Sequence, residues 1–395
     1  MQNSDLFLPQ MHPVIPFDLP KEYARLRAEA PITRVGCPAG IDAWLMTRHA
    51  DVRAVLSNAR FSSRGALFWH IRFEDDPPPG AFHRFDGAAH QRFRRALGPE
   101  LSARRVSELR PVIERIVAGR LDAMAALGGP VDLYRELALP VPSLVIGELL
   151  GVPGEEQSWY HERSQLLLRA DATREERERT LAEMLDYMRN LVASKRRESG
   201  EDLLSRLARG SGRAAEPFTD QELSFLGFLL LFAGHETTAS TIGLAVLALL
   251  RHPQQLAALR ADLGETGRAV EELLRYLPVL LPGLARYATE DIEVGDQRIR
   301  AGEWVVTALT SANRDQELCD RPDHLDLTRE PTPHVAFGYG PHQCIGQLLA
   351  RTEMEVVLRG LIGRFPELQL AVPFEQVPLR SDMVTHSVRA LPVTW

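Results

Sequence analysis

Hydrophobic positions along the chain recur mostly with helical spacing, and only short stretches alternate as strands do. The longest apolar run covers residues 223–250 and follows Thr219-Asp220-Gln221-Glu222, a capping-box sequence typical of a helix N-terminus. Other helical patterns cover residues 21–30, 49–56, 102–127, 131–150, 155–167, 174–197 and 269–276, and the stretch after Gly346. Strand patterns cover residues 32–35, 43–47, 279–286, 292–304 and 368–395. We therefore predict a mainly α fold with a minor β part, made by about residues 30–60 and 280–310 and the C-terminal strands.

The long apolar run is expected to be a core helix and not a membrane span. Its first part, residues 223–233, is too short to cross a bilayer, and the polar group at 234–238 interrupts it. Residues 1–20 lack a basic segment followed by an apolar one, so no signal peptide is expected.

The composition is that of an ordinary globular protein: 395 residues, 45% hydrophobic and 25% charged, with a net charge of -7. The mild acidity argues against nucleic acid as a partner. The three cysteines lie far apart, which excludes a redox or zinc-binding cysteine pair and fits a cytoplasmic protein. Since no linker, low-complexity run or repeat divides the chain, we expect residues 1–395 to form one domain, and a monomer.

One of these cysteines, Cys344, stands in an unusual setting. Glycines flank it at positions 338, 340 and 346, Phe337 precedes them, and a helical pattern follows. Such a turn can aim backbone N–H groups at the sulfur, and the helix places its positive end beside it, so both favour a thiolate. A thiolate without a partner ligand suits the axial position of a haem iron. The alternative is a buried structural cysteine in a glycine-rich turn.

The stretch F-G-x-G-x-H-x-C-x-G closely resembles the haem-binding loop of cytochromes P450, of the soluble bacterial type that tailors polyketides and macrolides. The resemblance implies haem b as cofactor, with Cys344 as the iron ligand and Phe337, Gly338, Gly346 and Ala233 in contact with it. It also implies the P450 fold, a triangular prism in which the haem lies between a long distal helix and the helix of the cysteine loop. His342 is too close to Cys344 in a tight loop to serve as a second axial ligand.

The middle of the long helix carries an acid and an alcohol, Glu236 and Thr237, after Ala233 and Gly234. An acid in a mostly apolar helix is costly unless it has a use. The alternative is a threonine bonded to the carbonyl four residues earlier and a glutamate that reaches bulk water. The segment resembles A-G-x-E/D-T of the P450 distal helix, which implies that Thr237 and Glu236 supply protons during oxygen activation.

Several basic residues are candidates for binding the haem propionates. His90 and Arg94 share one helix face, where they can bind a carboxylate, although alone they suggest a solvated basic helix. The resemblance assigns His90, Arg94, Arg286 and His342 to the propionates. The residues before His90 read D-G-A-A where relatives usually have D-P-P-E, which leaves the start of that helix open.

Glu272 and Arg275 match the E-x-x-R element of the P450 fold, which implies a structural role with a third basic residue downstream. In the corresponding P-x-R-F stretch this chain has His324 in place of arginine, so we expect His324 to be the third partner.

The residues expected to line the substrate pocket are mostly apolar: Leu67, Phe68, Trp69, Leu229, Phe232, Ala233, Val279, Leu280, Leu284 and Met383. They predict a medium to large lipophilic compound as the substrate. The resemblance implies a monooxygenase that hydroxylates or epoxidises a secondary metabolite with dioxygen. Oxidative coupling without oxygen insertion is an alternative, and so is a haem sensor, although a sensor needs no acid–alcohol pair.

No flavin or nicotinamide segment follows the cysteine loop, so electrons are expected from a ferredoxin and a ferredoxin reductase. Arg95, Arg104, Arg105 and Arg351 are candidate contacts for an acidic ferredoxin.

Overall fold

The structure is a computed structural model that describes residues 6–9, 16–37, 40–64, 67–68, 71–72, 76–169, 171–198, 200–210, 216–281, 283–380 and 385–395. Its longer helices are α1 (Lys21–Glu29), α2 (His49–Ser57), α3 (Gly87–Leu97), α4 (Ala103–Leu127), α5 (Pro140–Leu150), α6 (Gln157–Leu168), α7 (Arg174–Arg197), α8 (Leu203–Ala208), α9 (Asp220–Arg251), α10 (Pro253–Ala261), α11 (Thr266–Tyr276), α12 (Leu309–Ala312) and α13 (Gln347–Arg364).

The largest sheet has the strand order β1-β2-β10-β7-β3, from β1 (Ile32–Cys37), β2 (Ile41–Met46), β10 (Trp304–Thr307), β7 (Leu284–Ala288) and β3 (Phe61–Ser62). β10 pairs parallel with β2, and the other neighbours are antiparallel. A three-stranded sheet joins β11 (Gln369–Leu370), β14 (Pro392–Thr394) and β6 (Val131–Asp132). The remaining strands form the pairs β4 (Leu67–Phe68) with β5 (Ile71–Arg72), β8 (Ile292–Val294) with β9 (Gln297–Ile299), and β12 (Leu379–Arg380) with β13 (Ser387–Val388).

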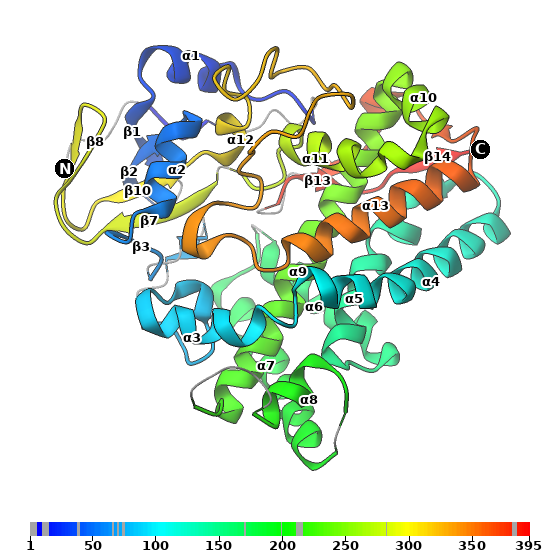
Figure 1. Cartoon of the computed structure of the whole chain (residues 1–395), viewed down its shortest axis with the longest axis horizontal. Helices are drawn as coiled ribbons and strands as arrows, with labels where there is room; N and C mark the ends of the chain where they lie inside the picture. The colour runs from blue at the N-terminus through cyan, green and yellow to red at the C-terminus, as the bar shows by residue number, and fades with distance from the viewer. Residues whose placement is uncertain are drawn as a thin grey trace.

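Figure 1 shows a roughly triangular outline, with the five-stranded sheet at one corner and helices filling the rest. The prediction of a mainly α fold with minor sheets is confirmed. One predicted helix is wrong in its first part: residues 131–150 hold β6 and a wider helical turn before α5 begins at Pro140. Proline has no N–H to donate, so it favours the first turn of a new helix.

Helix α9 runs through the middle of the helical part and is buried on nearly all sides. Its start is the predicted capping box: Thr219 Oγ1 accepts from the Glu222 N–H at 3.2 Å, and Glu222 Oε2 accepts from the Thr219 N–H at 2.8 Å. By length and composition α9 could cross a membrane, but 72% of its most apolar window is buried inside the fold. It is therefore the central core helix, as the interrupted apolar run predicts.

Helix α13 packs against α4 and α11 and carries the sulfur loop at its N-terminal end. Met354, Val357, Leu358 and Leu361 form a buried apolar stripe along α13. Close approach to α4 depends on Gly360, because a Cβ there would lie 3.0 Å from Leu121 Cδ1. This packing fixes where the loop before α13 can sit.

Glu353 on α13 is 2% exposed, and its Oε2 has no hydrogen-bond partner among the described residues. Burial raises the pKa of this carboxyl to about 8. A folded-state pKa above the unfolded value makes the fold lose stability as the pH rises from about 4.5 through about 8. Glu353→Gln is therefore expected to match the parent at pH 5 and to exceed it by about 2–4 kcal/mol at pH 9.

Thermal unfolding of both proteins between pH 5 and pH 9 measures this difference. Glu355→Gln is the matched control, because Glu355 lies two positions on and its Oε2 pairs with Arg110 Nη2 at 2.7 Å. An advantage of Glu353→Gln that does not grow with pH would contradict the prediction.

Candidate active site

The loop before α13 carries Cys344 and is folded into turns by backbone hydrogen bonds. The Cys344 N–H donates to the Phe337 carbonyl at 2.9 Å, and the Gln343 N–H donates to the Gly340 carbonyl at 3.0 Å. Gly340 has φ +73, and a Cβ there would lie 2.5 Å from the Leu56 carbonyl oxygen, so no larger residue fits. The loop is thereby pressed against α2.

Cys344 as a whole residue is exposed, although many protein atoms surround its sulfur. Burial raises the pKa of its thiol, while the Gly346 N–H and the charges of Arg94 and Arg351 oppose that rise. The predicted N–H to the sulfur is therefore present. The Gly346 N–H acts on the sulfur in the predicted direction, and burial acts against it. A positively charged partner at the sulfur would complete the stabilisation.

Three of the predicted propionate partners come together beside this loop. The rings of His90 and His342 stack with centroids 4.0 Å apart, and Arg94 Nη1 donates to the Gln343 carbonyl at 2.8 Å. Burial, together with the neighbouring His342, Arg94 and Arg286, lowers the pKa of His90 to about 4. Together with Arg286 on β7, these three residues from α3 and the loop form one group of hydrogen-bond donors and cations.

Arg286 is the member of this group that most needs an anion. Its side chain is 7% exposed and, in the part of the chain that the structure describes, has no carboxylate within ion-pair distance. Its Nη1 donates to the Ala285 carbonyl at 2.7 Å, and burial lowers its pKa to about 10. A buried guanidinium without a counter-ion is costly, so this position suits a ligand carboxylate.

Asp86 is a neighbour of this group that the sequence did not single out. It precedes α3, which begins at Gly87, and its side chain does not cap that helix. Instead its Oδ1 lies 3.3 Å from His342 Nε2 and accepts from Ser63 Oγ at 3.0 Å, and these bonds hold the pKa of Asp86 well below its usual range. His342 therefore already has an anionic partner within the chain.

Ala233 and Thr237 mark an accessible spot halfway along the buried helix α9. Ala233 is exposed and Thr237 is half-buried, whereas most of their neighbours in the helix are buried. Thr237 Oγ1 donates to the Ala233 carbonyl at 2.8 Å, which is the local bond that the sequence left as an alternative.

Glu236 points into the protein and not to bulk water, so the alternative of a solvent-exposed carboxylate is wrong. It is 1% exposed, and its Oε1 accepts from Arg380 Nη1 at 2.5 Å and from Tyr134 Oη at 3.4 Å. Its Oε2 has no hydrogen-bond partner among the described residues. Arg380 lies 144 positions away in the sequence, so no local pattern could indicate this contact.

Glu272 and Arg275 form the predicted ion pair, with Arg275 Nε and Nη2 donating to the two carboxylate oxygens at 2.7 and 2.8 Å. The remaining donors of Arg275 reach the carbonyls of Asn313, Pro322 and His324 at 2.9, 2.7 and 3.1 Å. All five guanidinium hydrogens therefore have acceptors. The pair attaches the coil before the Cys344 loop to α11.

The expected third partner, His324, is a wrong assignment. His324 is exposed and contributes its backbone carbonyl, whereas Arg329 Nε lies 3.2 Å from Glu272 Oε2. The basic residue that folds back onto the pair comes five positions later than expected, because the turn after Pro322 directs the side chain of residue 324 outward.

Comparison with known proteins agrees with this arrangement. A family model described as "Cytochrome P450" matches residues 164–386. Nocardicin C N-oxygenase of Nocardia uniformis subsp. tsuyamanensis is 45% identical over 96% of both chains, and pentalenic acid synthase of Streptomyces avermitilis is 43% identical over 96% of this chain and 95% of its own. The crystal structure of CYP105P1 in complex with filipin I superposes with a TM-score of 0.94 at 40% identity, covering 99% of each chain.

The chain belongs to the cytochrome P450 family. It is an oxidoreductase of the monooxygenase type, and its cofactor is haem. The residues present fit that cofactor: the Cys344 sulfur is accessible, Ala233 is exposed on a buried helix, and the buried Arg286 guanidinium has no carboxylate among the described residues.

Among the predicted pocket residues of this P450 whose side chains the structure describes, Ala233 is exposed and the others are half-buried, namely Leu229, Phe232, Val279, Leu280 and Leu284. Leu284 touches the sulfur loop, because a Cβ on Gly338 would lie 3.3 Å from its Cδ1. Leu67 and Phe68 form β4, and their side chains lie outside the described set, as do Trp69 and Met383 altogether.

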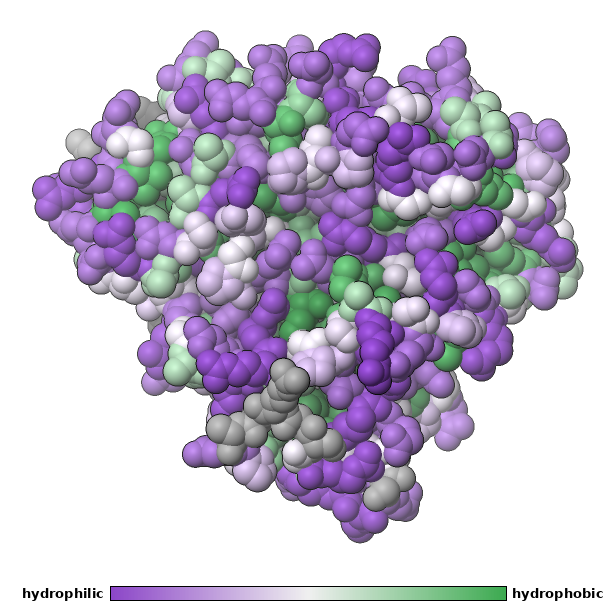
Figure 2. Space-filling model, in the orientation of Figure 1, coloured by the Kyte–Doolittle hydropathy of each residue, from purple (hydrophilic) through white to green (hydrophobic). Residues whose placement is uncertain are grey.

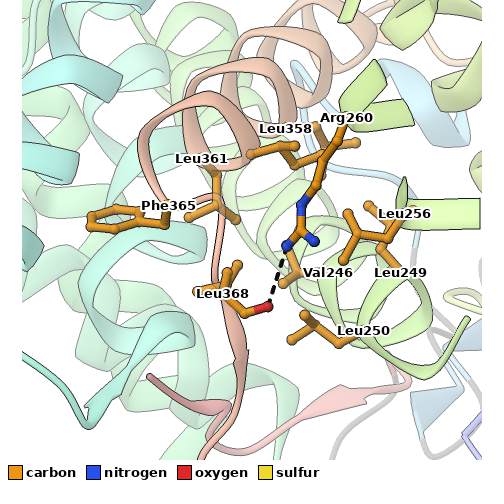
Figure 3. A pocket seen from close by; sticks show the side chains of 10 residues that line it. Val246, Leu249, Leu250, Leu256, Arg260, Leu358, Leu361, Phe365 and Leu368 are labelled. Carbon is orange, nitrogen blue, oxygen red and sulfur yellow. Dashed lines mark hydrogen bonds between the residues drawn. The ribbon is translucent and has the colours of Figure 1, made fainter. Parts of the chain in front are cut away.

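A separate small pocket lies between α9, α10 and α13, away from the sulfur loop (Figure 3). Leucine and other apolar side chains line it, with Arg260 Nη2 donating to the Leu368 carbonyl at 3.4 Å. It holds no acid, thiol or histidine, so it is a packing gap of the core and not a second reaction site.

Proposed function

We propose that this P450 inserts one atom of dioxygen into a lipophilic secondary metabolite, by hydroxylation or epoxidation, and that Cys344 would hold the haem iron. The observation that carries the proposal is the exposed Cys344 in the glycine-rich loop, with the Gly346 N–H and the N-terminal end of α13 beside its sulfur. When bound, the haem supplies the redox and oxygen-activating chemistry that the protein side chains lack.

His90, Arg94, Arg286 and His342 would hold the two propionates. Arg286 gains most from a carboxylate, because it is buried and unpaired among the described residues, whereas His342 already lies near Asp86. Arg94 also links α3 to the Gln343 carbonyl, so the same side chain would orient both the cofactor and the sulfur loop. Phe337, Gly338, Gly346 and Ala233 would provide close backbone and side-chain contacts.

Thr237 and Glu236 would supply protons at the distal side. The Thr237 hydroxyl lies on the accessible spot of α9, and the adjacent Glu236 carboxylate is buried, with no hydrogen-bond partner for Oε2 among the residues that the structure describes. Since Arg380 and Tyr134 hold Oε1, proton transfer would use Oε2 or a rotation that releases Arg380.

The substrate is inferred to be a medium-sized or large lipophilic natural product. The described pocket residues are all apolar, and they offer no charged anchor for a polar ligand. The similar proteins named for nocardicin C and pentalenic acid act within secondary metabolism, which supports the same setting for this P450. We infer a cytoplasmic monomer that receives electrons from a ferredoxin and its reductase.

The haem-loaded protein tests this function when supplied with a ferredoxin, its reductase and a panel of lipophilic metabolites. A shift of the haem Soret band identifies binders, and isotopically labelled dioxygen then reveals insertion by product mass. One labelled oxygen atom in the product is the expected result. A product that loses two hydrogens and gains no label would establish coupling instead, and binding without turnover would favour a sensor.

Ferredoxin docking is expected on the face where α13 begins. Figure 2 shows a hydrophobic patch near the centre of this face among hydrophilic surroundings, and Leu348 in α13 is 38% exposed. Of the predicted contacts, Arg104 is 89% exposed and bonds to Glu108, and Arg95 bonds to Gln91. Arg351 is less available, because its guanidinium binds Glu271 at 2.6 and 3.1 Å.

Charge reversal of Arg95 and Arg104 is expected to slow reduction by ferredoxin about tenfold at low salt, and the difference is expected to vanish at high salt. Stopped-flow reduction under carbon monoxide measures the rate. Arg298→Glu, on the distant β8–β9 hairpin, is the control. An unchanged rate and salt dependence would place the docking surface elsewhere.

A further inference from the structure

Three side chains with metal-binding atoms converge behind the accessible spot of α9. His235 and Glu236 come from α9, and His161 comes from α6. His161 Nδ1 lies 2.8 Å from His235 Nε2, which in turn lies 3.6 Å from Glu236 Oε2. All three atoms lie within 4.8 Å of one another.

The three ligand atoms of this cluster have more lone pairs facing one another than hydrogens available to bridge them. One hydrogen can bridge the two imidazoles, and that bond leaves Glu236 Oε2 without a partner among the described residues, although Glu236 is 1% exposed. An orphaned buried carboxylate oxygen is costly. A cation in the place of the bridging hydrogen would use all three lone pairs at once.

The spacing suits a small divalent ion. Tetrahedral zinc, with bonds of about 2.0 Å, separates its ligand atoms by about 3.3 Å. Two of the separations, 2.8 and 3.6 Å, lie on either side of that value, and the third pair of atoms lies within 4.8 Å, so side-chain rotations would complete the site. Burial lowers the pKa of both His161 and His235 to about 4, so both imidazoles are neutral and able to bind a metal at neutral pH.

Two features of the surroundings limit the affinity of these three residues for a metal ion. Arg380 places a positive charge on the other oxygen of Glu236, and His235 Nδ1 has no described acceptor for the hydrogen it would carry when Nε2 binds a metal. Metal-bound histidines usually have such an acceptor. We therefore expect a dissociation constant on the order of 10 μM, much weaker than that of a structural zinc site.

We propose that His161, His235 and Glu236 form a binding site for a divalent transition metal, with zinc as the ion it fits best, and that its occupancy inhibits the enzyme. Three protein ligands leave a fourth position for water. Binding would take Glu236 Oε2 out of proton transfer and would join α6 to α9. The inhibition, unlike the binding itself, rests on the proton-transfer role proposed above for Glu236.

Calorimetric titration of the haem-loaded protein with zinc tests the site. One ion per chain is expected, with affinity reduced at least about thirtyfold in His161→Ala and unchanged in His324→Ala, a control at an exposed histidine. Zinc X-ray absorption is expected to show two imidazole ligands and oxygen ligands. Haem content and circular dichroism verify that each variant is folded. If His161→Ala does not fold, His235→Asn replaces it in the titration.

Equal zinc affinity in the parent and in folded His161→Ala or His235→Asn would overturn the site. Turnover with and without zinc then separates the two parts of the proposal. Inhibition of the parent that is lost in His161→Ala is the expected result. Zinc bound by two imidazoles with no effect on turnover would retain the site and overturn the inhibition together with the proton-transfer role of Glu236.

Discussion

Cys344→Ala is expected to remove the red-shifted Soret band that marks thiolate-bound haem in the reduced carbon monoxide complex. Turnover is expected to fall at least about a hundredfold, or about 2.7 kcal/mol in barrier height. The reason is that Cys344 is the proposed residue that would hold the haem iron, and no other thiol lies in this loop. Difference spectra of the purified variant and steady-state turnover measure the two effects.

Cys319→Ala is the matched control, because Cys319 is a half-buried thiol outside the sulfur loop. That variant is expected to keep both the spectrum and the turnover of the parent. A Cys344→Ala protein that retains the red-shifted band would show that another group binds the iron and would refute the proposed ligand.

Glu272→Gln is expected to destabilise the fold by about 3–5 kcal/mol, because it leaves the charge of Arg275 buried without its partner. The carboxylate also accepts from the Asp326 N–H at 2.9 Å and lies 3.2 Å from Arg329, so one substitution weakens several contacts. A lower Tm and reduced haem content are the expected observations, since the coil attached to this pair leads to the sulfur loop.

Glu271→Gln provides the comparison from the adjacent position. Glu271 binds Arg351 and the buried His334 at a partly exposed site, so its loss is expected to cost less than the loss of Glu272, about 1–2 kcal/mol. Arg329→Gln is expected to lower the Tm clearly, whereas His324→Ala is expected to leave the Tm unchanged. A larger effect at His324 than at Arg329 would contradict the assignment of the third partner.

The sequence predicts well those parts of the site whose residues lie within one turn or one helix. The Phe337–Gly346 loop, the Glu272–Arg275 pair and the start of α9 at Thr219 depend on neighbours a few positions away, so local spacing determines their geometry. The helix ends agree for the same reason where a capping side chain is present.

Contacts between distant segments could not be predicted in this way. Nothing near Arg380 indicates that it binds Glu236, and the choice between His324 and Arg329 depends on the path of a coil without regular structure. His235 stands out in the sequence because it lies inside the A-G-x-E-T segment. Its contact with His161 could not be predicted, because His161 is 74 positions away.

The hydrogen bond from Thr237 to the Ala233 carbonyl determines which way this alcohol can act. A hydroxyl group has one hydrogen and two lone pairs, and here the hydrogen is already directed along the helix axis toward the main chain. Toward the accessible side Thr237 thus offers only acceptor positions, so it would first receive a hydrogen bond from an incoming water or ligand. Donation from Thr237 requires that the side chain release the carbonyl, so if Thr237 supplies protons as proposed above, the torsion of this one side chain would control that supply.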